Sequence, residues 1–490
     1  MQLVMTSGLI VAAIAAALVA LIGLATAVHS TRLRPHGYMH LIFYVMLLMV
    51  AVTSLLSGRN LNSLDLSSVD AGATGSHVQV MMQRLVSLVL LAVSGERIVS
   101  YLVRRDRPAC GSPLLLAVFV LFWICTVAAP ALFGAHPTLG HEYFYSLIIG
   151  IAAALTTPTE RDLALNAVRD ALLLFILVGL LPIPFKTTLV LQTAYAQGYL
   201  PGVPRLAGLA PHAVSLGALT QLFLLCLMVR PYPKAWLNRL AWTVGLTVIV
   251  LAQAKTSWIC FVVCTGCVIV VRDGPTFWRR VGDPFRPAFG VTWITVFMAI
   301  VLTIALFLMF GHLGQRLSDF FSSSEGEQLA SLTGRAKIWA VAIDVWQRNP
   351  VFGYGPNLWD DSFRAAIGMP FATHAHNELL DALSRSGTVG GAGLVIYATV
   401  LLVLSLRYAR ATDGLSLALF AILFLRSISE VPLILFGYGA ELITPMLLIM
   451  TLSGAAAEAR ARRSSSKTAT GLVVPARSAR AGPLTSTPLR

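Results

Sequence analysis

The chain has 490 residues, of which 57% are hydrophobic and 12% are charged, with a mean hydropathy of +0.77. A soluble globular domain carries about 25% charged residues, so this composition excludes that class and indicates a polytopic membrane protein. The formal net charge of +14 does not indicate nucleic-acid binding, because the basic residues fall in short connections between apolar runs. Such connections face the cytoplasm, and anionic lipid headgroups are then the expected partners of the charge.

Apolar runs of about 15 to 23 residues recur along the chain, and about 20 residues cross a bilayer. In chain order, the predicted helices lie near 8–28, 38–57, 81–103, 114–134, 142–156, 171–185, 211–229, 240–254, 257–271, 288–310, 389–406, 415–432 and 437–453. The first run lacks a basic leader and a small-residue cleavage site, so we interpret it as a retained helix. If the chain starts outside, every basic connection falls on the cytoplasmic side.

These runs predict an all-α fold, a polytopic transmembrane bundle of about 12 to 13 helices with one large outer loop that contains amphipathic helices. Four parts follow from the spacing. Residues 1–310 form ten transmembrane helices, 311–388 form the large loop, 389–454 form the C-terminal helices, and 455–490 form a basic, Ser-rich tail. We expect this tail to be cytoplasmic and disordered.

The large loop contains one strongly amphipathic segment, RAKIWAVAIDVWQR. Its apolar residues share one helical face, and Pro350 ends the pattern. We expect this helix to lie at the membrane interface, with its tryptophans at headgroup level. Further along, Asp360 and Asp361 have no histidine at ligand spacing, which favours a solvated loop over a divalent-cation site. The sequence therefore predicts no metal and no other cofactor.

Residues 373–391 read THAHNELLDALSRSGTVGG, a polar segment in a mostly apolar chain. His376 or Asn377 can cap a short helix that Gly387 ends. A helix N-terminus attracts phosphate and disfavours an imidazolium, so a neutral His376 could accept a proton beside a bound diphosphate. The alternative is that His376 and Asn377 only cap the helix.

The same stretch carries a recognisable spacing: His376 and Asn377, nine residues, Gly387, two residues, and Gly390. This pattern resembles the H-[NSQ]-x9-G-x2-G motif of the O-antigen ligase and polymerase superfamily, membrane enzymes that handle undecaprenyl-diphosphate-linked glycans. The order TGRAKIW, FGYGPNLW, HAHN is also similar to that family, and QAKTSW at 253–258 is similar to an S-K-T turn of exopolysaccharide polymerases, with Ala254 in place of serine. The resemblance covers about residues 200 to 432.

The resemblance implies a GT-C-like, metal-independent glycosyltransferase. Arg205, in an R-x3-L pattern with Leu209, and Arg335, in TGRAKIW, correspond to the family's two functional arginines. Guanidinium forks suit the oxygens of a diphosphate leaving group, and His376 is the candidate general base or positioning group. An alternative for each arginine is an interfacial side chain that reaches lipid headgroups.

Five more residues are candidate substrate-binding groups. Lys255 lies in a predicted tight outer turn, where an ammonium group needs water or an anion. His374 and Asn377 flank His376. Arg426 and Glu430 form an R-x3-E pattern that resembles the polymerases, although the spacing alone favours an i,i+4 salt bridge.

The predicted function is polymerisation of undecaprenyl-diphosphate-linked glycan repeat units into a surface polysaccharide or exopolysaccharide, at the periplasmic face of a bacterial inner membrane. The expected partners are the lipid-linked glycan donor, a glycan acceptor and membrane lipids, with other polysaccharide-assembly proteins as further candidates. A ligase that transfers the glycan to lipid A core, another anchor or a protein is the first alternative. A lipid-glycan transporter is the second, disfavoured because internal repeats are absent from the sequence.

Overall fold

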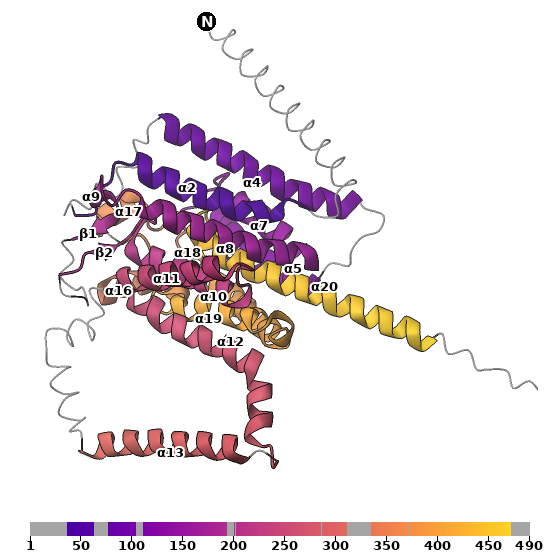
Figure 1. The fold of residues 1–490 in the computed structure, drawn as a ribbon. Coiled ribbons are helices and arrows are strands. Elements are labelled where there is room, and N and C mark those ends of the chain that lie inside the picture. The colour runs from indigo at the N-terminus through magenta and orange to yellow at the C-terminus, as the bar shows by residue number, and fades with distance from the viewer. Residues whose placement is uncertain are drawn as a thin grey trace, which may run out of the picture.

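A computed structural model describes residues 37–62, 77–103, 111–193, 200, 202–285, 287–310, 335–370 and 372–471 of the chain. The predicted helix near 8–28, the start of the large loop at 311–334, and the tail from 472 onward lie outside the described residues. The structure is 75% helical with almost no strand, so the predicted all-α fold is confirmed. Figure 1 shows a bundle in which most helices run roughly along one direction.

The first half of the chain supplies one side of the bundle. Its helices are η1 (Met39–Leu41), α2 (Ile42–Leu56), α4 (His77–Val103), α5 (Pro113–Trp123), the π-helical segment η3 (Ile124–Ala128), α6 (Ala129–Phe133), α7 (Tyr143–Ala154), α8 (Pro158–Leu180) and α9 (Thr187–Val190). Two short strands, β1 (Leu191–Gln192) and β2 (Arg205–Leu206), pair antiparallel with Leu191 opposite Leu206.

The second half completes the bundle and carries the soluble segment. Its helices are α10 (Ala213–Val229), α11 (Ala235–Leu251), α12 (Lys255–Val281), α13 (Pro287–Phe310), α16 (Arg335–Arg348), α17 (Asp361–Ala366), α18 (Glu378–Arg407), η5 (Arg410–Thr412), α19 (Leu415–Ser427), η6 (Ala440–Leu442) and α20 (Ile443–Gly471). In Figure 1, α13 extends away from the other helices.

Seven helices in the described residues are long and apolar enough to cross a membrane, and five shorter apolar helices accompany them. The most buried of the seven is the span formed by η6 and α20, with 89% of its apolar window inside the protein against at most 56% for the other six. Consecutive residues from Met446 to Met450 are at most 1% exposed. Helix α20, the last of the described helices, is therefore the central packing element of the bundle.

The two ends of the bundle differ in character. At one end, Arg230 just after α10 pairs with Asp162 of α8 at 2.9 Å, and Arg161 pairs with Glu458 of α20 at 3.1 Å. The other end of α10 lies about 25 Å away, at 1.5 Å per residue. Figure 1 shows α9, β1, β2, α16 and α17 gathered at that second end.

Helix α8 is longer than the predicted segment at 171–185 because it begins at Pro158. Thr157 and Glu160 form a capping box, which satisfies two backbone donors at once. The charged first turns hid this helix from a search for apolar runs. Their charges are paired inside the bundle, for example Arg97 with Glu160 at 3.1 Å.

The predicted disordered tail begins at 455, whereas α20 continues to Gly471. The sequence AAAEARARR contains strong helix formers, and Glu458 pairs with both Arg161 and Arg462. Packing against α8 therefore extends α20 beyond the apolar run. Disorder from 455 to 471 is a wrong prediction for this structure.

Candidate functional site

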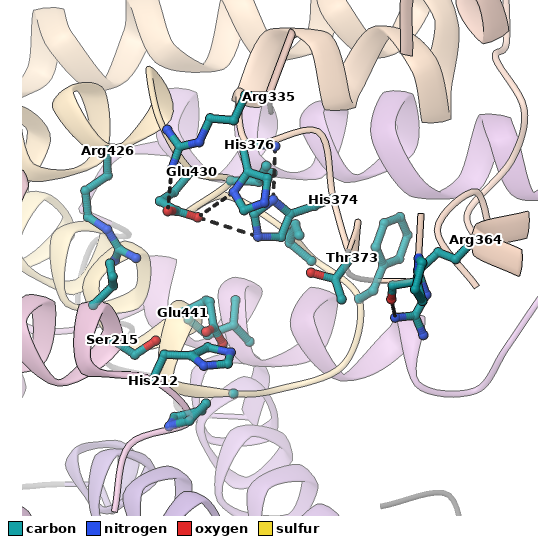
Figure 2. A pocket seen from close by; sticks show the side chains of 18 residues that line it. His212, Ser215, Arg335, Arg364, Thr373, His374, His376, Arg426, Glu430 and Glu441 are labelled. Atoms are coloured by element: carbon teal, nitrogen blue, oxygen red, sulfur yellow. Dashed lines mark hydrogen bonds and ion pairs between the residues drawn. The ribbon is translucent and has the colours of Figure 1, made fainter. Parts of the chain in front are cut away.

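One cavity of about 560 Å³ opens among the segments at the second end of the bundle. Figure 2 shows Arg335, His374 and His376 grouped around Glu430, with His212 across the cavity from them. The lining consists of Pro211, His212, Val214, Ser215, Arg335, Arg364, Pro370, Thr373, His374, His376, Arg426, Glu430, Val431, Ile434, Phe436, Gly439, Glu441 and Leu442. We call it the polar pocket.

The turn VFGYGP, residues 351–356, lies directly against residues 384–388, where the first helical stretch of α18 ends. The amides of Tyr354 and Gly355 donate to the carbonyls of Ser384 and Arg385, each at 2.9 Å. In the opposite direction, the amide of Thr388 donates to Pro350 at 2.8 Å. This backbone contact explains why glycines recur on both segments, since a side chain at the contact would separate them.

Gly387 is the point where the two backbones come closest. Its φ of 63° and ψ of −165° break α18 at this position, as the sequence predicted for the end of the first helical stretch. A Cβ at Gly387 would lie 2.2 Å from the carbonyl oxygen of Val351. The first glycine of the motif is therefore required by both conformation and space.

Asp381, in the first turns of α18, holds the loop of residues 374–377 in place; we call this loop, which reads HAHN, the HAHN loop. Its carboxylate accepts hydrogen bonds from the amide of Ala375 and from the indole of Trp359, both at 2.9 Å, and pairs with Arg385 at 2.7 Å. Trp339 of α16 also binds this loop, because its indole donates to the carbonyl of Ala375 at 2.9 Å. The predicted amphipathic helix is thus confirmed at Arg335–Arg348, but its buried face packs against protein.

Asn377, and not His376, caps α18. Its Oδ1 accepts from the amide of Leu380 at 3.0 Å, while its Nδ2 donates to the carbonyl of Ile428 at 3.3 Å. The next residue, Glu378, accepts from the amide of Leu433 at 3.0 Å. These two contacts fix the segment that carries Glu430 beside the loop that carries His376.

His376 has a φ of 49°, in the left-handed region that non-glycine residues seldom adopt. Its amide donates to Nδ1 of His374 at 3.1 Å. An observed backbone outlier at a pocket supports a functional hypothesis for the residue that bears it.

Glu430 is the shared partner of three basic side chains. Its carboxylate lies 3.4 Å from Nδ1 of His376, 3.5 Å from Nε2 of His374 and 3.6 Å from the guanidinium of Arg335. Burial alone would raise the pKa of Glu430, but the contact with His376 and the charges of His374, His376 and Arg335 outweigh burial and lower that pKa. The carboxylate is therefore ionised near neutral pH.

His374 is neutral near pH 7, because burial and then the charge of His376 lower its pKa to about 4. Since its Nδ1 accepts a hydrogen bond, the proton of the neutral ring is on Nε2, which faces Glu430. For His376, the carboxylate favours a proton on Nδ1, although 3.4 Å is long for a hydrogen bond and the atom has no well-aligned partner among the described residues. The lone pair of His376 would then be on Nε2.

The predicted site residues divide into two groups. His374, His376, Arg335, Arg426 and Glu430 line the polar pocket, and Asn377 lies beside it as the helix cap. The i,i+4 salt bridge suggested by the spacing of Arg426 and Glu430 is not formed, because Glu430 lies beyond the end of α19 and pairs with Arg335 and the two histidines. The guanidinium of Arg426 makes no hydrogen bond or ion pair with any residue that the structure describes.

Arg205 and Lys255 lie at the same end of the bundle but outside the lining of the polar pocket. The guanidinium of Arg205 donates to the carbonyl of Ala252 at 2.9 Å, in the turn that precedes α12. Lys255 is exposed in the first turn of that helix. The charge of Arg205 still contributes to lowering the pKa of His212, after burial and the charge of Arg59.

Sequence reasoning missed His212, Arg364 and Glu441 as pocket residues. Arg59 positions His212, because its guanidinium donates to the carbonyls of Gly208 and Ala210, each at 2.7 Å, in the loop before α10. The only signal in the sequence was the polar break LAPH before an apolar run. This break marks the start of α10, but it gives no information about which pocket His212 lines.

An apolar groove of about 270 Å³ lies between α18 and α19, on the side of Asn377 and Ile428. Its walls are mainly leucine, valine and phenylalanine side chains, and Asn377 and Glu378 close its polar end. The groove therefore leads along the apolar surface toward the segment that carries His376 and Glu430.

His374, His376 and Glu430 have the composition of a metal site, since one ligand atom of each lies within 4.8 Å of the others. Two imidazoles and a carboxylate are a common ligand set for zinc. Arg335 competes with such an ion, because its guanidinium is 3.6 Å from the same carboxylate.

The fold and the pocket define a class: a polytopic helical membrane protein with a cationic, histidine-bearing cavity at one end of its bundle. Residues 240–395 match the family model described as O-antigen ligase, and this similarity supports the resemblance to the O-antigen ligase and polymerase superfamily. Members of this family are glycosyltransferase-like membrane enzymes. No curated protein matches the chain.

Proposed function

We propose that the protein polymerises undecaprenyl-diphosphate-linked glycan repeat units at the periplasmic face of the bacterial inner membrane. The observation that carries the proposal is the convergence of Arg335, Arg426, His376 and Glu430 on one pocket beside an apolar groove. The family implies a lipid-linked glycan substrate. The groove accommodates part of the lipid chain, and the pocket receives its diphosphate.

Arg335 and Arg426 hold the diphosphate in this mechanism. A guanidinium presents several N–H donors in a fixed plane and stays charged at every physiological pH, so it can stabilise the negative charge that develops on a leaving diphosphate. Arg426 is suited to this role because its guanidinium has no ion-pair partner among the described residues. Arg205 and Lys255 attract the diphosphate from farther away.

His376 acts as the general base. A hydroxyl of the acceptor glycan attacks C1 of the donor sugar, and its proton passes to Nε2 of His376. The new C1–O bond replaces the bond to the diphosphate, which leaves on its lipid. Glu430 stabilises the imidazolium that forms, as the carboxylate does in other acid–base pairs. Attack opposite the leaving group inverts the anomeric configuration.

A ligase would use the same pocket with a different acceptor, such as lipid A core, another anchor or a protein. The QAKTSW turn and the GYGPNLW context favour the polymerase. The glycan that accumulates after deletion of the gene distinguishes the two: we expect single lipid-linked repeat units, measured by mass spectrometry of the extracted lipids. Long lipid-linked chains would identify a ligase, and single repeats confined to the cytoplasmic face would identify a transporter.

We place the polar pocket on the periplasmic side, because the basic connections mark the opposite end of the bundle. Alkaline phosphatase folds only where its disulfides can form. A fusion at Asp360, the cap of α17, should therefore be active in a bacterial host, and a fusion after Ala457 should be inactive. The reverse pattern of activities would place the pocket in the cytoplasm and contradict the proposal.

We also propose that catalysis is independent of metal ions, because Arg335 already neutralises Glu430. Purified enzyme with its lipid-linked donor should keep its turnover rate in excess EDTA. Loss of activity that zinc restores would instead make His374, His376 and Glu430 a metal centre. Loss that only magnesium or manganese restores would point to the carboxylates of Asp360 and Asp361.

A further inference from the structure

A second cavity of about 880 Å³ adjoins the polar pocket. The two share Ile434 and Phe436 in their linings, so these side chains form a common wall. The second cavity continues between α4 and α7, under the turn that contains Pro356 and Asn357. We call it the aromatic cavity.

The aromatic cavity is lined by rings with polar groups at their edges. Tyr145 and Tyr438 are in edge contact at 5.5 Å between ring centroids, and Tyr143 meets Phe436 in the same way at 5.3 Å. The hydroxyl of Tyr143 donates to Oδ1 of Asn357 at 3.0 Å. Flat apolar faces beside hydrogen-bonding groups match a sugar ring, which has C–H groups on its faces and hydroxyls at its edge.

The aromatic cavity is tied to the polar pocket by shared residues. Arg385 lines the cavity and lies 5.4 Å from the ring centroid of Phe436. The same guanidinium pairs with Asp381, which fixes the loop of His374 and His376. A ligand that contacts Arg385 is therefore connected, through the ion pair between Arg385 and Asp381, to the loop that carries the proposed base His376.

The segment 428–438 contributes to the linings of all three cavities. Ile428 lines the apolar groove, Glu430 lines the polar pocket, and Tyr438 lines the aromatic cavity. With the lipid of the donor in the groove and its diphosphate in the pocket, the aromatic cavity is an adjoining space from which a hydroxyl can approach the donor sugar away from its leaving group.

We propose that the aromatic cavity binds the sugar rings of the acceptor glycan, with Tyr145 as its main stacking residue. This assignment rests on the proposed glycosyl transfer, and it adds the location and the chemistry of the second substrate. It also identifies Tyr145, Tyr438 and Asn357 as residues that determine which acceptor is used.

The test uses the oligosaccharide that mild acid releases from the lipid-linked glycans of the producing cell. This probe lacks both the lipid and the diphosphate, so its binding reports on sugar recognition alone. Saturation-transfer NMR with full-length protein in detergent should give signals from the sugar ring protons. Tyr145→Ala should weaken binding roughly fivefold to tenfold, which corresponds to the loss of an aromatic contact of about 1 to 1.4 kcal/mol.

Two variants serve as controls. Tyr145→Phe keeps the ring and should bind as the wild type does, which also shows that the position tolerates substitution. Tyr101→Ala is the matched control, because Tyr101 is half-buried on α4 and lies about 15 Å along the helix from Leu91, the nearest residue of α4 that lines the cavity. Tyr101→Ala should leave binding unchanged.

Unchanged binding in Tyr145→Ala, or displacement of the oligosaccharide by inorganic pyrophosphate, would overturn the assignment. Kinetics separate the two possible sources of sugar: Tyr145→Ala should raise the KM for the oligosaccharide used as acceptor and leave the KM for the donor unchanged. A raised donor KM alone would assign the cavity to the donor glycan. If the deletion strain makes normal glycan, glycosyl transfer is wrong, whereas oligosaccharide binding can still be measured.

Discussion

Replacing His376 with asparagine should lower the turnover number by roughly 10²- to 10⁴-fold, the usual contribution of a general base. Asparagine adopts left-handed φ values more readily than most residues, so the φ of 49° can persist. The helix cap also persists, because Asn377 supplies it. An amide cannot accept a proton near neutral pH, which leaves proton transfer as the function that is lost. Turnover of purified protein with its lipid-linked donor measures the effect.

Arg335→Lys is the contrasting variant. The positive charge near Glu430 remains, but the planar set of N–H donors is lost, so donor affinity should fall together with the rate. In His376→Asn, by comparison, donor affinity should be close to that of the wild type. If His376→Asn makes normal amounts of glycan, His376 has a structural role and the proposed mechanism is wrong.

Gly387→Ala should have the largest effect on folding. The added Cβ would lie 2.2 Å from the carbonyl oxygen and 2.3 Å from the carbonyl carbon of Val351, and the φ of 63° disfavours alanine. Relief requires the turn at 351–355 to move, which breaks the bond from Thr388 to Pro350. We expect a cost of at least about 3 kcal/mol, and hence a low yield of folded protein and a lower melting temperature in detergent.

Gly266→Ala is the matched control for this substitution. Gly266 lies within α12, and none of the described residues outside its own helical turn comes within 4 Å of the place that a Cβ would take. Alanine at this position should therefore be neutral or stabilise the helix by up to about 1 kcal/mol. A Gly387→Ala protein with the melting temperature and activity of the wild type would show that the contact between the two backbones is dispensable.

The sequence predicted the helical bundle and five of the eight charged or histidine residues that line the polar pocket. Apolar runs mark helices because each helix must satisfy its own backbone in the bilayer. His374, His376 and Asn377 are close in sequence, so their meeting at a helix start follows from local structure. The pairing of Arg335 with Glu430 is a tertiary contact, and no spacing rule could supply it.

Asp381 illustrates what sequence patterns leave out. In the sequence it is a polar residue in the first turns of a helix, where acidic side chains are common at the surface. In the structure it is 2% exposed and holds the HAHN loop. Burial and partners depend on how α16, α17 and α18 pack together, and the helical periodicity of each segment contains no information on that packing.

The central position of α20 has a consequence for biogenesis. A ribosome makes α20 after every other helix that the structure describes, so the surrounding helices enter the membrane before the element that they pack around exists. Until α20 is made, they lack the contacts of Met446 to Met450. A chain that stops before Ile443 should therefore insert but be degraded by membrane proteases, so loss of α20 should be as damaging as much earlier termination.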